Sequence, residues 1–270
     1  MTGKTKRLLF IFLKLCLLMG VFIFTFVYFC NPSKLEIVFY IFTIFCISIL
    51  NLAYCYVLLN IKFQNKNIKK QVKKKLNNFE RVEDAPIYYI NNQKVYANIL
   101  LDYLTNLNEI EYNVFVEKGY IFIVGTYQDL KSFNKQKGIT GLFSKYNKYI
   151  LLYTDSLSKE SGEFVPTPLL QFKSTFYHEW GHFVDYLNSF ISDTISFQYH
   201  YYKKKKEIDN SVRFMYSGNL YLYLRNNPLR NLYEFKSSSE YFAVNYSRYR
   251  MGSTTGDIYL DNIFEHLRKE

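Results

Sequence analysis

Cysteine, proline and histidine are all scarce in this chain of 270 residues, which holds 4, 5 and 4 of them, respectively. The four cysteines are Cys16, Cys30, Cys46 and Cys55, so none lies beyond residue 55. A disulfide framework and a zinc site made of thiolates are therefore excluded for the rest of the chain. This absence fits a reducing cytoplasm and equally an exported bacterial domain.

The chain also lacks a net charge beyond residue 81, although its overall formal charge is +11. Residues 1–81 carry 13 basic and 2 acidic side chains, whereas residues 82–270 carry 21 of each. The basic excess lies beside two apolar runs, where it suits anionic lipid headgroups. The run Lys203–Lys206 is typical of a solvated helix face, with a binding patch as the alternative. The charge pattern does not support a nucleic-acid partner.

Charged side chains are nearly absent from two stretches, residues 8–30 and 35–59. Each is long enough to cross about 30 Å of hydrocarbon as a helix. They predict a transmembrane helical hairpin over residues 1–60, followed by a basic juxtamembrane stalk over residues 61–81. Lysine and arginine flank both outer ends of the hairpin. The positive-inside rule therefore predicts a two-span membrane protein with its later domain in the cytoplasm.

Residues 82–270 have the size of a single domain with one core. Alternation and turn residues predict strands at Ile87–Ile90, Tyr112–Val116, Tyr120–Val124 and Tyr149–Tyr153. Helical spacing predicts helices at Ala97–Leu107, at Tyr127–Lys135 and over most of the remainder. The fold class is therefore α+β.

Two of the four histidines lie within the sequence His-Glu-Trp-Gly-His, from His178 to His182. This is the H-E-x-x-H pattern of zinc-dependent peptidases. On a helix, positions four apart project from one face, so both imidazoles can bind one ion while Glu179 lies beside the water that the ion holds. The alternative is a helix with two ordinary histidines and a surface carboxylate.

A helix is predicted around this motif, with Thr167 as its N-cap and Pro168 as its first residue, running to about Phe190. Apolar residues nearly surround it, which predicts burial, and Gly181 allows another element to approach closely. Zinc needs a third protein ligand in a catalytic site. Asp185 lies too far along the helix to supply it and is interpreted either as a partner of a zinc ligand or as a local structural carboxylate.

A later segment, Glu240-Tyr241-Phe242-Ala243, follows three serines that predict a capped helix. With His-Glu-x-Gly-His-x-x-Asp upstream, it resembles the catalytic domain of anthrax toxin lethal factor and the related secreted proline-proline endopeptidases. The likeness covers about residues 172–250. It implies a zincin-like fold, with Glu240 as the third zinc ligand and Tyr233, seven residues earlier, as a catalytic residue that stabilises the oxyanion. It also suggests a preference for proline beside the scissile bond.

The chain departs from that family at Val244, where an acidic residue usually stands one turn after the ligand glutamate. A partner that orients a zinc histidine is thus missing, which predicts weaker metal binding or a substitute such as Asp185. In zinc peptidases of this design, a strand upstream of the motif helix borders the cleft and pairs with an extended substrate. Tyr149–Tyr153 is either that strand or an ordinary core strand.

Together these patterns predict a membrane-anchored zinc metalloendopeptidase with one Zn²⁺, metal ligands His178, His182 and Glu240, and catalytic residues Glu179 and Tyr233. Its expected partners are a peptide or protein substrate and the lipid bilayer. One alternative is an HtpX-like membrane quality-control peptidase, although Val244 stands where that group has aspartate. A second is a catalytically idle zincin-fold binding protein. Because the lethal factor relatives are exported, a cell-surface or secreted location is the alternative to the cytoplasm.

Overall fold

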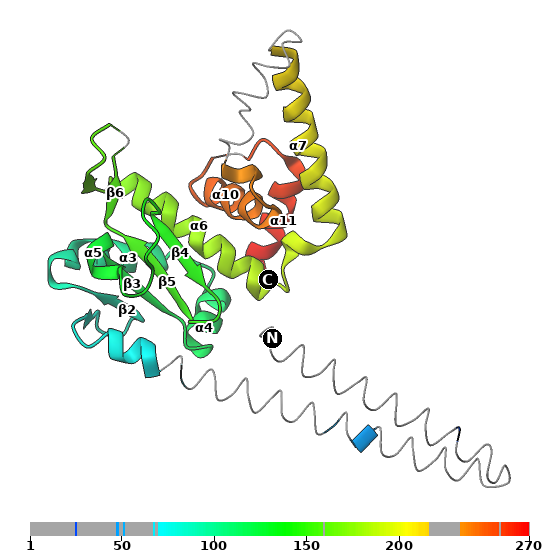
Figure 1. Ribbon diagram of the computed structural model, residues 1–270. Helices are drawn as coiled ribbons and strands as arrows, with labels where there is room; N and C mark the ends of the chain where they lie inside the picture. The colour runs from blue at the N-terminus through cyan, green and yellow to red at the C-terminus, as the bar shows by residue number, and fades with distance from the viewer. Residues whose placement is uncertain are drawn as a thin grey trace. The chain divides into compact units, whose positions relative to one another are not determined.

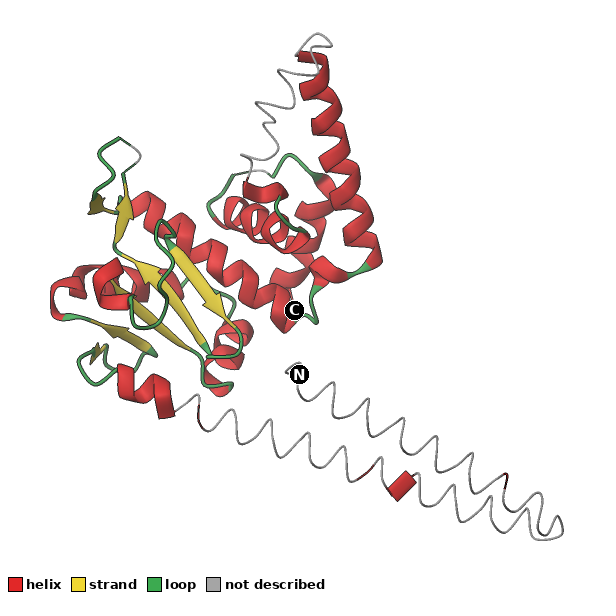
Figure 2. Ribbon diagram, in the orientation of Figure 1, coloured by secondary structure: helices red, strands yellow, loops and turns green. Residues whose placement is uncertain are grey.

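The computed structural model describes residues 70–269 except 159, 216–232 and 254, together with the isolated positions 25, 47, 48, 51 and 67. Residues Gln71–Glu270 form one compact unit, and Met1–Lys70 form another that lies almost wholly outside the described residues. Within the larger unit, strands and helices are mixed up to residue 167, and every described element after it is helical (Figure 2). The structure therefore has the predicted α+β class.

The main sheet has five strands in the order β1-β2-β3-β5-β4, with three parallel strands in the middle and an antiparallel strand at each edge. A separate antiparallel pair, β6 and β7, follows it in the chain. The strand bounds are β1 (Glu80–Arg81), β2 (Ile87–Tyr89), β3 (Ile121–Gly125), β4 (Gly141–Ser144), β5 (Tyr149–Tyr153), β6 (Asp155–Leu157) and β7 (Phe164–Pro166).

The helices differ in length, and two of them exceed 18 residues. Three 3-10 turns, each of three residues, lie between them. The bounds are η2 (Asn91–Gln93), α3 (Lys94–Leu104), α4 (Glu109–Glu117), α5 (Tyr127–Leu130), α6 (Leu169–Leu187), η3 (Ile191–Asp193), α7 (Ile195–Met215), η4 (Tyr233–Phe235), α10 (Ser238–Arg250) and α11 (Ile258–Lys269).

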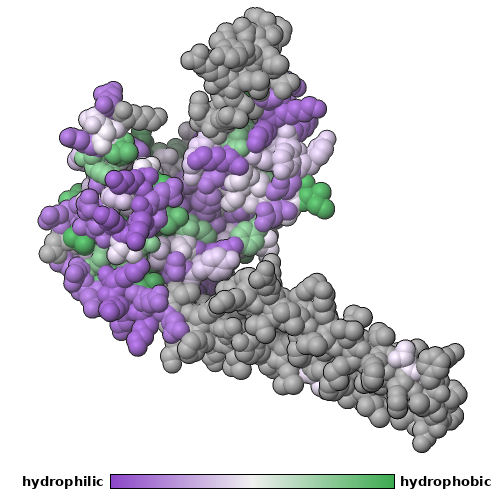
Figure 3. Space-filling model, viewed as in Figure 1, coloured by the Kyte–Doolittle hydropathy of each residue, from purple (hydrophilic) through white to green (hydrophobic). Residues whose placement is uncertain are grey.

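Side-chain alternation along β3 and β5 divides the core into two layers. Phe122 and Ile150 face a large cluster that includes α3, α4 and α6. Ile123 and Leu151 face a smaller cluster that includes α5 and residues between 72 and 79. The sheet is therefore covered on both faces, and the view of Figure 3 shows mostly hydrophilic side chains with small apolar patches on the described surface.

Helix α6 lies between the sheet and the helices α7, α10 and α11 (Figure 1). Its Phe176, Trp180 and Phe183 are fully buried and pack with Phe115 of α4 and Phe122 of β3. Full burial of such side chains contributes on the order of 1.5–3 kcal/mol each. The helix that carries the two histidines is thus fixed against the sheet by its aromatic face.

Side-chain caps explain where several helices begin. Asn108 Oδ1 accepts a hydrogen bond from Ile110 N (2.8 Å) at the start of α4, and Ser237 Oγ accepts one from Glu240 N (3.1 Å) at the start of α10. Thr126 and Asp129 form a reciprocal capping box at α5. Each cap satisfies donors that a helix N-terminus leaves unpaired.

Several predicted elements need correction. Tyr112–Val116 belongs to helix α4 and not to a strand, so no hairpin joins it to the following strand β3. The N-cap of α6 is Pro168, while the side chain of Thr167 donates to Tyr153 O instead. The strand Tyr149–Tyr153 is confirmed as β5, but it lies between β3 and β4 and is fully buried. Of the two alternatives for Tyr149–Tyr153, a strand that borders the cleft or an ordinary core strand, the structure shows the core strand.

The prediction of a membrane hairpin also needs correction. In the described part of the chain, no helix combines the length and the apolar character that a bilayer crossing requires. The longest described helices are α6 and α7, and both carry several charged side chains, among them Lys173, Asp185 and Lys204. The predicted spans, residues 8–30 and 35–59, fall almost wholly outside the described residues. The predicted two-span membrane location and cytoplasmic placement depended on those spans and fall with them.

Candidate metal centre

Helix α6 places His178 and His182 on one face, as their spacing predicts. The centres of the two imidazole rings are 4.8 Å apart, and the ring planes are nearly perpendicular at 89°. Each side chain is 14% exposed, so the pair is accessible to an ion without lying on the open surface. The two Nε2 atoms both face the start of α10.

Helix α10 brings Glu240 to these imidazoles. Its Oε2 atom lies 3.2 Å from His178 Nε2 and 3.5 Å from His182 Nε2. This oxygen is buried, and no hydrogen bond of acceptable geometry satisfies it. Burial alone would raise the pKa of the Glu240 carboxyl, but the two imidazoles outweigh that effect and hold its pKa well below the usual range.

The three donor atoms form a group that can hold a metal ion, since all of them lie within 4.8 Å of one another. Tetrahedral zinc with bonds of about 2.1 Å requires donor atoms about 3.4 Å apart. The separations of 3.2 and 3.5 Å between Glu240 and the histidines match that requirement. A buried carboxylate oxygen that lacks a hydrogen bond and faces two ring nitrogens is what a cation between them would satisfy.

The close approach of α10 to α6 depends on Gly181. A Cβ atom built at this position would lie 3.1 Å from Ala243 Cα and 3.2 Å from Tyr246 Cβ. The two helices are also joined by Ser247 Oγ, which donates to Ser174 O at 2.9 Å. The glycine within the motif therefore permits the contact that carries Glu240 to the histidines, as the sequence predicts.

Glu179 points from α6 toward the edge strand β4. Its Oε2 accepts a hydrogen bond from Phe143 N at 2.6 Å, and the residue is only 7% exposed. Burial raises the pKa of the Glu179 carboxyl, although His178 and His182 oppose the shift. A Cβ atom at Gly141 would lie 2.7 Å from Glu179 Cγ, so glycine there makes room for this side chain. Glu179 is thus a buried carboxyl group that is held by β4 and lies close to the imidazole pair.

Tyr233 reaches the same centre from η4. Its hydroxyl donates to Glu240 Oε1 at 3.0 Å, and its ring centre lies 5.7 Å from that of His178. Burial and the neighbouring Glu240 carboxylate raise the pKa of Tyr233, so the hydroxyl remains a hydrogen-bond donor at neutral pH. The Lys236 ammonium lies over the ring at 4.2 Å. All five residues singled out from the sequence therefore meet at one place.

The surrounding polar contacts differ from expectation. His182 Nδ1 is in hydrogen-bond contact with Ser239 Oγ at 3.1 Å, and Ser239 was not singled out from the sequence. Asp185 instead accepts hydrogen bonds from Ser192 N (2.8 Å) and Ser192 Oγ (2.6 Å), so it fixes the chain after α6. Of the two interpretations of Asp185, the structure supports the local structural carboxylate.

A cavity of about 740 Å³ adjoins the centre, and Val244 lies in its wall. Its lining comes from α6, α10, η4 and the segment 138–141 that leads into β4. Within this wall, Thr175 Oγ1 donates a hydrogen bond to Thr140 Oγ1 at 3.1 Å. Val244 stands where the lethal factor family usually has an acidic residue, and it adds apolar surface to this wall.

Sequence reasoning missed the strand that borders the site. Strand β4 is only four residues long and has one glycine at its start, so it offers little alternation to detect. Its edge position and its bond to Glu179 follow from tertiary pairing with β5. The available signal was Gly141 itself, because a glycine near a strand often marks a close approach.

No protein-family model, no curated protein and no solved structure matches this chain. The resemblance to the lethal factor catalytic domain therefore rests on the two motifs around His178 and Glu240. His178, His182 and Glu240 form a group able to hold a metal ion within an α+β fold.

Proposed function

We propose that this protein is a zinc metalloendopeptidase. The observation that carries the proposal is the convergence of His178, His182 and Glu240 with Glu179 directly beside them. Two imidazoles, one carboxylate and an adjacent glutamate are the constellation of a hydrolytic zinc site with an open fourth position. The two imidazole nitrogen donors favour zinc over calcium or magnesium, which prefer oxygen ligands.

His178, His182 and Glu240 would hold the zinc ion, which would lower the pKa of a bound water toward 7 and polarise the carbonyl of a peptide bond. Glu179 accepts the proton from that water and passes it to the leaving amine. Its Oε2 is already fixed by Phe143 N, so the carboxylate cannot rotate freely away from the site. Burial raises the pKa of its carboxyl, which makes this carboxylate a stronger base than an exposed one.

Tyr233 is proposed as the donor to the oxyanion that develops on the attacked carbonyl. Its hydroxyl donates to Glu240 Oε1 and so lies next to a ligand atom of the metal group. A donor in this place stabilises charge that appears only in the transition state. The side chain is 48% exposed, so it can change partner when a substrate is bound.

The substrate is proposed to be an extended peptide that adds to the outer edge of β4. The carbonyl oxygens of Thr140 and Ser144 point to the β5 side. They accept hydrogen bonds from Tyr153 N and Lys148 N, respectively. In an antiparallel pair, successive residues point their N–H and C=O groups alternately toward and away from the partner strand. The N–H and C=O groups of Gly141 therefore point to the outer edge of β4. Gly141 also lines the cavity beside Glu179. A peptide paired there would have its carbonyl close to the metal group.

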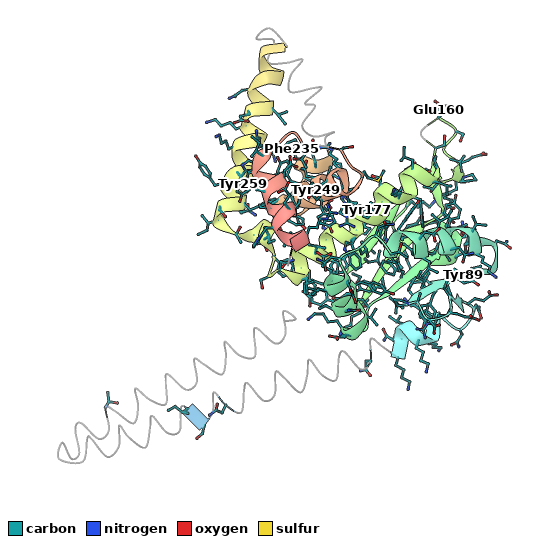
Figure 4. The ribbon with its side chains drawn as sticks, turned by 180° about the vertical axis from the view of Figure 1, so that it is seen from behind. Tyr89, Glu160, Tyr177, Phe235, Tyr249 and Tyr259 are labelled. Atoms are coloured by element: carbon teal, nitrogen blue, oxygen red, sulfur yellow. The ribbon has the colours of Figure 1, made fainter. Side chains whose placement is uncertain are left out.

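The test combines metal analysis with peptide cleavage by the purified full-length chain. We expect one tightly bound zinc and cleavage of a peptide library that stops when a chelator is added. Glu179→Ala should keep the zinc and lose cleavage, since it removes the base but no ligand. Glu160→Ala, in the exposed β6–β7 loop (Figure 4), is the matched control and should retain both.

Two results would overturn the proposal. Zinc bound with undiminished cleavage by Glu179→Ala would exclude Glu179 as the base. No bound metal, with no cleavage by the wild-type chain, would leave a catalytically idle binding protein as the better description.

A further inference from the structure

The short turn η4 carries Tyr233, and contacts made by the next two residues, Glu234 and Phe235, hold the turn in place. Three residues of 3-10 helix have too few internal hydrogen bonds to fix a side chain by themselves. The position of the Tyr233 hydroxyl therefore depends on what η4 is attached to.

The first attachment is an ion pair between neighbouring Glu234 and Arg248. Glu234 Oε2 lies 2.6 Å from an Nη1 atom of Arg248, and the Glu234 side chain is only 13% exposed. The angles are not those of a hydrogen bond, so the contact is an ion pair. Arg248 Nη1 also donates to Asn245 Oδ1 at 3.3 Å, which keeps the guanidinium close to α10. The Arg248 side chain is 47% exposed, so the pair restrains Glu234 mainly because its carboxylate would otherwise be buried without a counter-charge.

The second attachment is the burial of Phe235 (Figure 4), which is 3% exposed and packs on Tyr241 of α10 and Tyr201 of α7. Its carbonyl oxygen accepts hydrogen bonds from Tyr201 Oη (2.9 Å) and Lys205 Nζ (3.0 Å). This attachment fixes the end of η4, whereas the ion pair of Glu234 acts on the residue next to Tyr233.

Arg248 lies on the same helix as Glu240, eight residues further on and about 12 Å along the axis. A single helix therefore supplies both a member of the metal group and the cation that pairs with Glu234 of η4. This arrangement ties the position of the Tyr233 hydroxyl to the position of Glu240. Loss of the ion pair would free the start of η4 while leaving Glu240, Ser237 and the α6 contacts unchanged.

We propose that Arg248, acting through Glu234, is a positioning residue that holds the Tyr233 hydroxyl at the metal centre. The part of this inference that concerns catalysis rests on the proposed peptidase function. The part that concerns the position of Tyr233 does not, so the two can be tested separately.

The position of Tyr233 is tested without any enzymatic activity. Fluorotyrosine is placed at residue 233 of the full-length chain, and its fluorine resonance is recorded. In Arg248→Gln and Glu234→Gln, we expect the resonance to move toward the value of the denatured chain and to sharpen. Arg248→Lys keeps the charge and should restore most of the wild-type shift. Arg268→Gln, which makes the same change at an exposed site on α11, should leave the resonance unchanged.

The catalytic part is tested by kinetics on the same variants. Arg248→Gln should lower kcat about ten- to a hundredfold with little change in KM, because a misplaced group is lost from the transition state. In Tyr233→Phe, the Arg248→Gln change should then have little further effect. Since Arg248 also lines the cavity, a rise in KM at constant kcat would instead assign it to substrate binding and overturn the proposal.

An unchanged fluorine resonance in both Arg248→Gln and Glu234→Gln, with wild-type circular dichroism, would also overturn it. If the wild-type chain cleaves no peptide while the resonance moves as expected, the peptidase function fails and the positioning role stands. The two failures are therefore distinguishable.

Discussion

At the scale of residues, the sequence was sufficient to bring the two histidines together and insufficient to identify the residues that meet them. The i, i+4 spacing of His178 and His182 constrains them to one helical face, so their convergence could be inferred. Glu240 was reached only through a resemblance, because nothing in the chain itself states that α10 lies against α6. Ser239 could not be found at all, since its contact with His182 depends on how the two helices meet.

The contact between Ser239 and His182 leads to a prediction about metal affinity. The Ser239 hydroxyl lies 3.1 Å from His182 Nδ1, the ring nitrogen opposite the one that faces Glu240, so it orients the imidazole. Ser239→Ala should weaken zinc binding by about tenfold or more, within the range found for such outer partners. Titration against a competing chelator measures this. Ser239→Thr keeps a hydroxyl and should bind zinc like the wild type, and equal affinity of the alanine variant would contradict the role.

Glu111 leads to a prediction about pH and stability. It is 7% exposed within α4, where its Oε2 accepts from Trp180 Nε1 at 3.1 Å, and burial raises the pKa of its carboxyl. A raised pKa means that the folded state binds more protons than the unfolded state. The free energy of unfolding therefore falls as the pH rises from the unfolded pKa through the folded one.

Replacing the Glu111 carboxyl by an amide should remove this pH-dependent loss of stability. Glu111→Gln can still accept from Trp180 and carries no charge, so it should be more stable than the wild type at neutral pH and closer to it at acid pH. Urea unfolding at several pH values gives the comparison. A variant that is less stable at every pH would show that the carboxylate is better compensated than its burial indicates.

At the scale of elements, the predictions were right for long segments with a clear sequence pattern. They failed where contacts with distant residues determine which element forms. Helix α6 has 19 residues and a clear motif, and its extent was predicted closely. Helix α4 was assigned to a strand because Tyr112, Val114 and Val116 favour strands, yet Asn108 and the acidic first turn favour a helix. Strand β4 exists through its pairing with β5 and leaves almost no trace in the sequence.

The contact between α6 and α10 can be tested at Gly181. A methyl group there would lie 3.1 Å from Ala243 Cα, so α10 must move away by a few tenths of an ångström. Alanine is favoured over glycine inside a helix by roughly 1 kcal/mol, which offsets part of the strain. Gly181→Ala should therefore change thermal stability little while weakening zinc binding, because Glu240 moves with its helix.

A graded series separates this effect from simple destabilisation. Gly181→Ser and then Gly181→Val should weaken zinc binding progressively as the side chain grows. Ser174→Ala, which alters the same helix pair without adding volume, is the control and should bind zinc more tightly than any of them. Zinc affinity that is independent of side-chain size would contradict the idea that close approach of the helices sets the site.

At the scale of the molecule, the site joins two layers of the fold. Helix α6 packs on the sheet through Phe176, Trp180 and Phe183, and on α10 through Gly181 and Ser174. Alternation and helical spacing predicted the α+β class, whereas long apolar runs predicted a membrane hairpin that the described residues do not contain. Hydropathy reports only how long and how apolar a segment is. The arrangement of helices around a metal group depends on contacts between residues that are far apart in the chain.

This arrangement predicts that a bound ion stabilises the fold, because His178 and His182 are 58 residues or more before Glu240 in the chain and meet only in the folded state. Zinc at 100 times its dissociation constant should add about 2.7 kcal/mol to the free energy of unfolding. For a unit of this size that corresponds to a rise in Tm of roughly 5–10 °C, which a chelator should reverse. Differential scanning calorimetry of the full-length chain measures the shift, and the shift should grow with zinc concentration.

The carboxylate ligand supplies the matched control for this measurement. Glu240→Gln keeps the size of the side chain and the Ser237 cap, which uses the backbone of residue 240, but it loses the anionic donor. In that variant the chelator should change Tm little, because two imidazoles alone hold zinc weakly. A chelator-induced shift as large as in the wild type would place the stabilising ion elsewhere in the protein. Absence of a shift in the wild type, with zinc shown to be present and removed, would mean that the ion does not bind across α6 and α10.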